Sequence, residues 1–241
     1  MPNIRYLKIR FDQNIFPYDI PRFRAAVIEK TQRESDRFHN HKGEKEYLYR
    51  YPLIQYKVTD KKASILCLEE ATDDIHMLLQ NRDLDLRVGD RTASYAIEHI
   101  DLHYHQVQTW DRAFHYSLLN WQALNQKFFL RYHELEDDLP AQIDLLESIL
   151  RGHILAFATG IGWHVEDRIT AKITQVKQIK ALPFKGKDIW AFTLNFKTNV
   201  SLPNFIGLGK GSSVGFGVVK EIGGDIPAAT GSTHSQTNQN G

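Results

Sequence analysis

Between residues 207 and 217 the chain reads GLGKGSSVGFG, with five glycines among eleven residues. Glycine adopts backbone conformations that a β-carbon forbids, and it lets another group approach the main chain closely. Successive free N–H groups in such a segment can hold phosphate oxygens, helped here by Lys210, Ser212 and Ser213. A tight connection before an edge strand explains the glycines equally well, so their number alone leaves both interpretations open.

Two nucleotide-binding motifs do not fit this segment. A P-loop ends in Gly-Lys-Ser/Thr before a helix, whereas the β-branched residues after Gly217 predict a short strand at Val218–Ile222. A dinucleotide-binding fold would need a βαβ unit after the glycines, and the residues that follow are too few to form one.

Charge is distributed unevenly along the chain, although the formal net charge is only +1. The balance is +6 over residues 1–67, −11 over 68–167 and +8 over 168–220. Such segregation creates basic surfaces that the total charge hides. Lysines of the last block, including Lys185, Lys187 and Lys210, are therefore candidates to contact the phosphates of a nucleic acid. The alternative is a strand surface that is basic by chance.

Hydrophobic periodicity in the N-terminal part predicts a strand, a helix, two strands, a helix and a strand. This order is that of a split ferredoxin-like unit. The predicted elements are an opening strand around Leu7–Phe11, a helix from Ile20 to Lys30, strands at Pro52–Val58 and Ser64–Leu68, a helix at Ala71–Asn81 and a strand at Leu84–Val88.

The following residues predict a second unit of mixed helices and strands. Its predicted elements are a strand at Tyr95–His105, a helix at Ala113–Phe129, a helix opened by Pro140, a hairpin of Thr170–Leu182 with Asp188–Thr198, and the strand after the glycines. We therefore expect an α+β protein with two tandem ferredoxin-like (RRM-like) domains, 1–92 and 93–222. A polar tail, 223–241, is expected to be disordered.

The composition also narrows the cellular setting. A single cysteine, Cys67, excludes an internal disulfide framework and a Cys-based zinc cage. No apolar run is long enough to span a bilayer, and the first residues lack a signal-peptide pattern. We expect a cytoplasmic protein with no membrane partner and no cofactor.

The spacing of the glycines is more specific than their number. Gly-apolar-Gly, five residues and then Gly-Phe-Gly resembles the C-terminal signature of the RAMP superfamily, the RNA-binding proteins of CRISPR systems. Within it the chain resembles the repeat-processing endoribonucleases of subtype b. The resemblance covers residues 1 to about 222 and includes FHNH at 38–41, YRYPLIQYK at 49–57, LNWQALN at 119–125 and the helix entering Ala156–Gly162.

This resemblance implies a function in RNA processing. It implies metal-independent cleavage of CRISPR precursor RNA within its repeats, leaving a 2′,3′-cyclic phosphate and a 5′-hydroxyl, with histidine as the main catalyst. The expected partner is the repeat RNA, and other CRISPR effector subunits or a second copy of the chain are further candidates. A catalytically inactive RNA-binding subunit of an effector complex is the alternative function, and an unrelated ferredoxin-like binding domain is the third.

Two histidines and a lysine stand close together at His39, His41 and Lys42. Imidazole suits both proton transfers in RNA cleavage because its pKa lies near neutrality, and an ammonium can stabilise charge on the phosphate. If the stretch is extended, both histidines face one side. We expect His41 to be the principal acid or base and His39 its partner. A zinc site and plain surface histidines are the competing interpretations.

The remaining candidate residues are expected either to assist catalysis or to bind RNA. Family members also use tyrosine and lysine near the cleavage site, which makes Tyr47 or Tyr49, and Lys30 or Lys42, candidates to assist catalysis. The residues expected to bind RNA are Gly207, Gly209, Lys210, Gly211, Ser212, Ser213, Gly215, Phe216, Gly217, Lys185 and Lys187. Phe205 and Phe216 are candidates to stack on unpaired bases.

Overall fold

The N-terminal half forms a four-stranded antiparallel sheet with the strand order β2-β3-β1-β6. The computed structural model describes residues 3–31, 51–75, 78, 84–184 and 186–223. The elements of this half are β1 (Asn3–Asn14), η1 (Pro17–Asp19), α1 (Ile20–Lys30), β2 (Ile54–Thr59), β3 (Lys62–Leu68), α3 (Ala71–Asp74), β4 (Asp85–Val88), β5 (Arg91–Ser94) and β6 (Ile97–Gln106). The order is that of a ferredoxin-like unit, which confirms the predicted fold class for this half.

Alternation along β1 explains why it is the central strand. Leu7, Ile9 and Phe11 are buried on one face, in the same cluster as Phe23 of α1. Ile4 is buried on the other face of β1, in a cluster with side chains of the second half. A strand with apolar residues on both faces must be covered on both, and α1 covers only one of them. The predicted opening strand and helix are confirmed.

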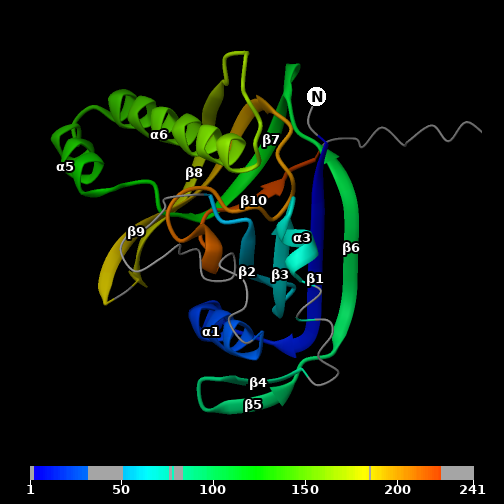
Figure 1. The fold of residues 1–241 in the computed structure, drawn as a ribbon. Helices are drawn as coiled ribbons and strands as arrows, with labels where there is room; N and C mark the ends of the chain where they lie inside the picture. Colours follow the sequence, from blue (N-terminus) through cyan, green and yellow to red (C-terminus); the bar gives the residue numbers. More distant parts are fainter. Residues whose placement is uncertain (1–2, 32–50, 76–77, 79–83, 185, 224–241) are drawn as a thin grey trace, which may run out of the picture.

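The fourth strand of this sheet differs from the prediction. The predicted closing strand, Leu84–Val88, instead pairs through residues 85–88 with β5 in a separate hairpin. The closing strand is β6, which pairs with β1 from Asn3↔Gln106 to Phe11↔Ile97 and forms the outer edge of the sheet (Figure 1). The predicted strand at Tyr95–His105 is therefore confirmed but belongs to the first sheet. The predicted domain boundary at 92–93 stays a prediction; pairing within the first sheet continues to Gln106, the end of β6.

The second half forms a similar sheet with the order β10-β7-β9-β8. Two helices connect its first two strands and lie on one side of the sheet (Figure 1). No second helix follows β9 in the described residues; the chain instead runs through the glycine segment, Gly207–Gly217, with one 3₁₀ turn. The elements are β7 (Thr109–Trp121), α5 (Gln126–Glu134), α6 (Leu139–Gly160), β8 (Ala171–Phe184), β9 (Lys187–Val200), η2 (Ser212–Val214) and β10 (Val218–Glu221).

The predicted helix at Ala113–Phe129 is wrong. Residues up to Trp121 belong to β7, and α5 begins only at Gln126, where the Asn125 side chain accepts a hydrogen bond from the amide of Phe128. The strand alternation is interrupted near Asn120, whose φ of 49° lies in the left-handed region, and the register shifts there. A bulge of this kind moves the following side chains to the other face and hides the strand period.

The two halves share one hydrophobic core. Side chains of the first sheet and of the second half lie in a single buried cluster, which includes Ile4, Tyr6, Leu66, Leu68, Leu118, Trp121, Phe157 and Ile206. A second cluster packs β1, β2 and β3 against α1. None of the described helices combines the length and the apolar character that crossing a membrane requires.

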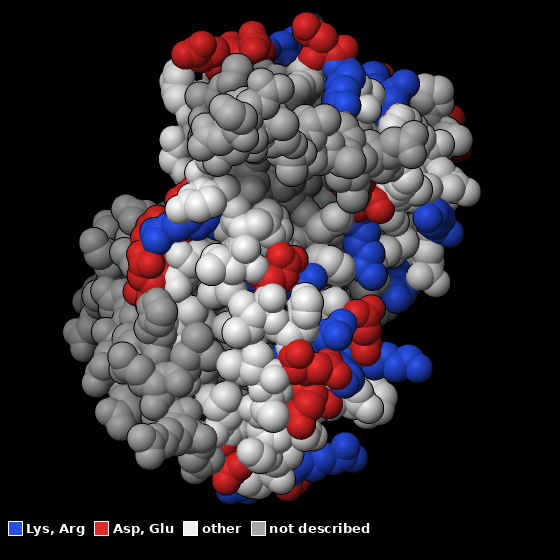
Figure 2. Space-filling model, turned by 90° about the vertical axis from the view of Figure 1, so that its right-hand side faces the viewer, with Lys and Arg blue, Asp and Glu red and all other residues white. Residues whose placement is uncertain are grey.

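Side chains on the edge strand β6 are mostly exposed. Ile100, Leu102 and Tyr104 are 50%, 66% and 70% exposed, at alternate positions of one face. In the view of Figure 2, acidic and basic side chains are interspersed among uncharged ones over the described residues of the face. The described part of this face therefore shows no continuous basic surface of the kind that nucleic acid requires.

Candidate nucleic-acid interface

The predicted catalytic segment lies largely outside the described residues. His39, His41, Lys42, Tyr47 and Tyr49 all fall within residues 32–50, and Lys185 also lies outside the described ranges. Lys30 is described: it ends α1 and is half-buried. The catalytic assignments therefore stay predictions.

The described chain on both sides of that segment is firmly held. Thr31 is buried, and both its amide and its hydroxyl donate hydrogen bonds to the Val27 carbonyl at the end of α1. On the other side, the ring of Tyr51 packs edge-on against Phe157 of α6, with ring centres 5.2 Å apart. The Cα of Gly160 faces Tyr51 so closely that a β-carbon there would lie 2.3 Å from the tyrosine Cβ. The described residues on either side of the predicted catalytic segment, Thr31 and Tyr51, are therefore both packed against the folded chain.

Four glycines of the glycine segment, Gly207, Gly209, Gly211 and Gly217, have no room for a β-carbon. A β-carbon on Gly217 would lie 1.9 Å from the carbonyl oxygen of Leu208, and the φ of Gly217 is 62°. A β-carbon on Gly209 would lie 2.9 Å from Nε1 of Trp121. Packing within the protein therefore requires these glycines, as the tight-connection interpretation expects.

Several amides of the glycine segment are already used in hydrogen bonds. The amides of Leu208 and Gly217 donate to the carbonyls of Gly217 and Asn120, at 2.9 and 3.2 Å. Those of Val214 and Phe216 both donate to the Gly211 carbonyl. The amides left to hold a ligand are therefore fewer than the sequence suggests.

Exposure separates the predicted RNA-binding residues into groups. Lys210 and Lys187 are exposed, while Gly207, Ser212 and Gly217 are buried. The half-buried members are Gly209, Gly211, Ser213, Gly215 and Phe216. Their binding roles stay predictions, but Lys210 is the side chain of the segment best placed to meet a ligand from solvent.

β2 fixes the glycine segment through a buried amide. The Gln55 side chain accepts a hydrogen bond from the amide of Gly207 at 2.8 Å. Its Nε2 donates to the hydroxyl of Tyr51 and to the carbonyl of Pro52, each at 2.9 Å. Gln55 is 0% exposed. One side chain thus joins Tyr51 and Pro52, which follow the predicted catalytic segment, to Gly207 at the start of the predicted RNA-binding segment.

Lys57, two residues further on the same face of β2, lies under the 3₁₀ turn of the glycine segment. Its ammonium donates one long hydrogen bond, 3.4 Å, to the carbonyl of Ser212, and the residue is 2% exposed. Burial lowers the pKa of Lys57 to about 7. The hydroxyl of its cross-strand neighbour Ser64 is buried and has no hydrogen-bond partner among the described residues. The contact between β2 and this turn is therefore electrostatically costly.

His153 of α6 packs behind Gly209 and Lys210. The indole Nε1 of Trp121 donates to Nδ1 of His153 at 3.0 Å. Indole nitrogen only donates, so the neutral imidazole carries its proton on Nε2. Burial, with a smaller contribution from the Lys210 charge, lowers the pKa of His153 to about 4. His153 is therefore neutral at pH 7 and cannot act as a base through Nδ1.

Some of the basic and aromatic side chains predicted to bind RNA already have partners within the protein, and others face solvent. On β8, Lys172 is paired with the buried carboxylate of Glu147 at 2.6 Å, whereas Lys177 is exposed. Lys8 and Lys220 lie over the ring of Phe205, 4.2 and 5.5 Å from its centre. Lys172 and Phe205 thus already have partners within the protein, whereas Lys177 faces solvent.

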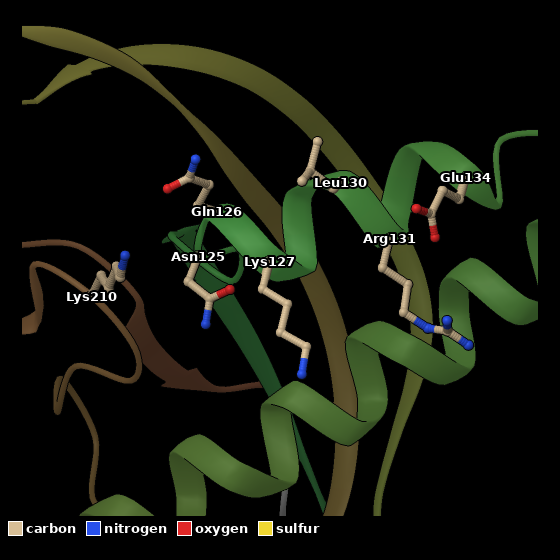
Figure 3. Close-up of a pocket in the computed structure, with 7 residues that line it drawn as sticks. All are labelled: Asn125, Gln126, Lys127, Leu130, Arg131, Glu134 and Lys210. Carbon is tan, nitrogen blue, oxygen red and sulfur yellow. The ribbon is translucent and has the colours of Figure 1, made fainter.

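An open hollow of about 750 Å³ adjoins Lys210. It is lined by Asn125, Gln126, Lys127, Leu130, Arg131 and Glu134 of α5 and its cap, together with Lys210 (Figure 3). Lys127 and Arg131 are not among the predicted binding residues, because they belong to the acidic middle block and to a stretch whose predicted helix is misplaced. Correct helix bounds would have shown them one turn apart.

Comparison with known proteins identifies the family. The family model described as the Cas6b N-terminal domain matches residues 2–108, and that of the Cas6b C-terminal domain matches residues 108–222. The chain belongs to the Cas6b family. The resemblance to repeat-processing CRISPR proteins that the sequence suggested is thereby confirmed.

Individual relatives of this Cas6b chain agree with the family models. An uncharacterized protein of Methanocaldococcus jannaschii is 35% identical over 102 residues, which are 42% of this chain and 67% of the relative. A crystal structure of Cas6b matches with a TM-score of 0.81 and 24% identity, over 92% of this chain and all of the other. A CRISPR RNA processing endoribonuclease Cas6b matches with a TM-score of 0.69 and 20% identity over the same shares. These structures confirm the fold of two ferredoxin-like units.

Proposed function

We propose that this protein is an endoribonuclease that cuts CRISPR precursor RNA within its repeats, in the cytoplasm. The observation that carries the proposal is the match of both Cas6b family models, which together span residues 2–222. One similar structure is described as a CRISPR RNA processing endoribonuclease, and a more distant one, with a TM-score of 0.54, as a Cas6 crRNA endonuclease.

The proposed chemistry is transesterification by the 2′-hydroxyl. Its oxygen attacks the adjacent phosphorus while one histidine, His41 or His39, removes the hydroxyl proton. The other histidine gives a proton to the departing 5′-oxygen, which leaves a 2′,3′-cyclic phosphate and a 5′-hydroxyl. Lys42 or Lys30 stabilises the charge that builds on the phosphate oxygens, and Tyr47 or Tyr49 assists. Both proton transfers are supplied by side chains, which is the reason for proposing that no metal takes part.

RNA binding is proposed to involve the exposed cations of the second half. Lys210 of the glycine segment and Lys187 at the start of β9 are both exposed. Neutralising phosphates with such side chains makes affinity fall steeply with salt. The hydrogen bonds of Gln55 support this proposal. They hold the glycine segment, at Gly207, next to Tyr51.

The test is incubation of the protein with its repeat RNA in EDTA. We expect a single cut, products that end in a cyclic phosphate, and complete protection by a 2′-deoxy nucleotide on the 5′ side of the cut. RNA that stays intact both in EDTA and with added Mg²⁺ would remove the endonuclease proposal. Cleavage of the deoxy substrate would remove the proposed 2′-hydroxyl mechanism, and cleavage only with Mg²⁺ would remove its metal independence. Intact RNA that nevertheless binds tightly would instead favour an inactive RNA-binding subunit.

The histidine assignment needs its own variants. His41→Ala is expected to slow cleavage about 10²–10⁴-fold at saturating RNA, and His39→Ala to slow it by a similar or smaller factor. His99→Ala, on the exposed strand β6, is the control and should cleave like the original chain. Unchanged cleavage by both His41→Ala and His39→Ala would remove the assignment and leave the activity standing.

A further inference from the structure

The hollow beside α5, lined by Asn125, Gln126, Lys127, Leu130, Arg131, Glu134 and Lys210, gathers three cationic side chains. Within the part of the chain that the structure describes, neither Lys127, Arg131 nor Lys210 forms an ion pair with a carboxylate. Several exposed or half-buried cations of the first sheet differ, since Arg5, Arg10 and Lys62 are all ion-paired. Three such cations around one hollow form a site for an anion.

The cations come from two segments that the fold brings together. Lys127 and Arg131 are four residues apart on α5, so they share one face of the helix and project to the same side in Figure 3. Lys210 reaches the hollow from the glycine segment, which an isolated bridge between Gln122 and Lys210 holds next to the end of β7. The packing that excludes a side chain at Gly209 therefore also sets the position of Lys210.

Polar and apolar groups complete the site. Asn125 uses its Oδ1 to cap α5, which leaves its Nδ2 as a donor at the hollow. The exposed side chain of Leu130 offers an apolar surface. Glu134 lies at the end of the hollow away from Lys210, and the exposed acidic residues Glu136 and Asp137 follow it. Charge thus reverses along the helix, which limits an anionic chain to the part of the hollow nearest Lys210.

We propose that this hollow binds backbone phosphates of a single-stranded stretch of the RNA substrate. The proposal rests on the proposed function for the identity of the RNA. Lys210 and Lys127 contact phosphates, Arg131 forms a two-pronged contact through its guanidinium, and Leu130 packs against ribose or base. The volume of the hollow, about 750 Å³, can hold a nucleotide and is much larger than a lone phosphate ion needs.

The experiment measures affinity without cleavage. Full-length protein is titrated into fluorescently labelled repeat RNA with a 2′-deoxy nucleotide at the scissile position, at several salt concentrations. We expect Lys127→Ala and Arg131→Ala each to raise Kd about 3–10-fold, and each to reduce the slope of log affinity against log salt by about 0.7. Arg91→Ala, on the exposed β4–β5 hairpin away from α5 in Figure 1, is the charge-matched control with unchanged Kd.

Several results would overturn the proposal. It fails if both variants keep the original Kd and salt slope, or if Arg91→Ala loses as much affinity as they do. It also fails if the variants lose affinity for inorganic phosphate while RNA binding is unchanged. All these cations are exposed, so the melting temperature should be unaffected and the comparison is free of unfolding.

A second measurement locates the contact on the RNA. Single phosphates are replaced by uncharged methylphosphonates, and the loss of affinity at each position is compared between the original chain and Lys127→Ala. At the contacted phosphate the two losses should not add, because the same interaction is removed twice. Additive losses at every position would contradict a phosphate contact by Lys127. Binding with these properties but without any cutting of unmodified RNA would remove the endonuclease proposal and leave the hollow proposal intact.

Discussion

At the scale of single residues, Lys57 is the side chain whose burial has the clearest measurable consequence. Its ammonium lies between β2 and the 3₁₀ turn of the glycine segment, with one weak acceptor among the described residues. A buried group with a lowered pKa binds its proton more tightly in the unfolded chain. Below about pH 7 the lysine is protonated in both states, and the folded state bears the whole cost of burying the charge.

We therefore predict that stability rises with pH above about 7. Between that pKa and the ordinary lysine pKa, the unfolded chain holds the extra proton, so the free energy of unfolding should increase by up to about 1.4 kcal/mol per pH unit. Lys57→Met, of similar length and uncharged, should be more stable than the original chain at pH 6 and should lack this rise. Urea unfolding at pH 6, 7, 8 and 9 measures both curves. Parallel curves for the two proteins would show that Lys57 does not titrate in this range.

At the scale of elements, the contact between β2 and the glycine segment depends on one amide side chain. Gln55→Leu would leave the Gly207 amide buried without its acceptor and the Tyr51 hydroxyl without its donor. Each buried unsatisfied polar group costs about 1–3 kcal/mol. We predict a loss of about 2–4 kcal/mol in the free energy of unfolding, measured by urea denaturation. Gln178→Leu, at an exposed position of β8, should change it by less than about 0.5 kcal/mol. Equal effects of the two substitutions would contradict the role of Gln55.

The elements also show what the sequence could predict. Strands with regular alternation, such as β1 and β9, and helices opened by proline, such as α1 and α6, could be predicted because local periodicity determines them. The end of β7 resembles a helix in sequence because the bulge at Asn120 breaks its period. The prediction groups β6 with the later strands, whereas it pairs with β1 in the first sheet. Its partner lies about ninety residues earlier, and pairing at that distance leaves no local signal.

The residues of the candidate site also differ in whether the sequence alone could predict them. Lys210 could be predicted from the glycine segment itself, because glycines and lysine stand together in the sequence. Lys127 and Arg131 could not, since only the packing of α5 beside that segment makes them its neighbours. Gln55 and Lys57 stand within a motif that carries the family resemblance. Their contacts with Gly207 and Ser212 span about 150 residues, and only the folded chain reveals them.

At the scale of the whole molecule, the shared core predicts that the two halves unfold together. Residues of β1 and β3 are buried in the same cluster as residues of β7, α6 and the glycine segment. All four tryptophans, Trp110, Trp121, Trp163 and Trp190, belong to the second half, and the single cysteine, Cys67, is buried in the first. Tryptophan fluorescence and the reaction of Cys67 with a thiol reagent therefore report on different halves.

We predict that both probes give the same urea midpoint. A common core makes partial unfolding expose apolar surface in the half that remains folded, which favours a single cooperative transition. The thiol signal comes from one position, because the chain has only one cysteine. Reaction of Cys67 at a urea concentration where the fluorescence is still that of the folded protein would show that the first half unfolds by itself.

The short strand β10 is synthesised long after β7, the strand with which it pairs. β10 pairs with β7, and roughly a hundred residues separate Trp121 from Val218. At ribosomal rates of about 5–20 residues per second, β7 emerges on the order of 5–20 s before its outer neighbour. During that interval one edge of β7 is unpaired and can associate with another nascent chain. The glycine segment arrives with β10, so the strand that closes the sheet and the loop that joins the two halves reach their places in the same final step.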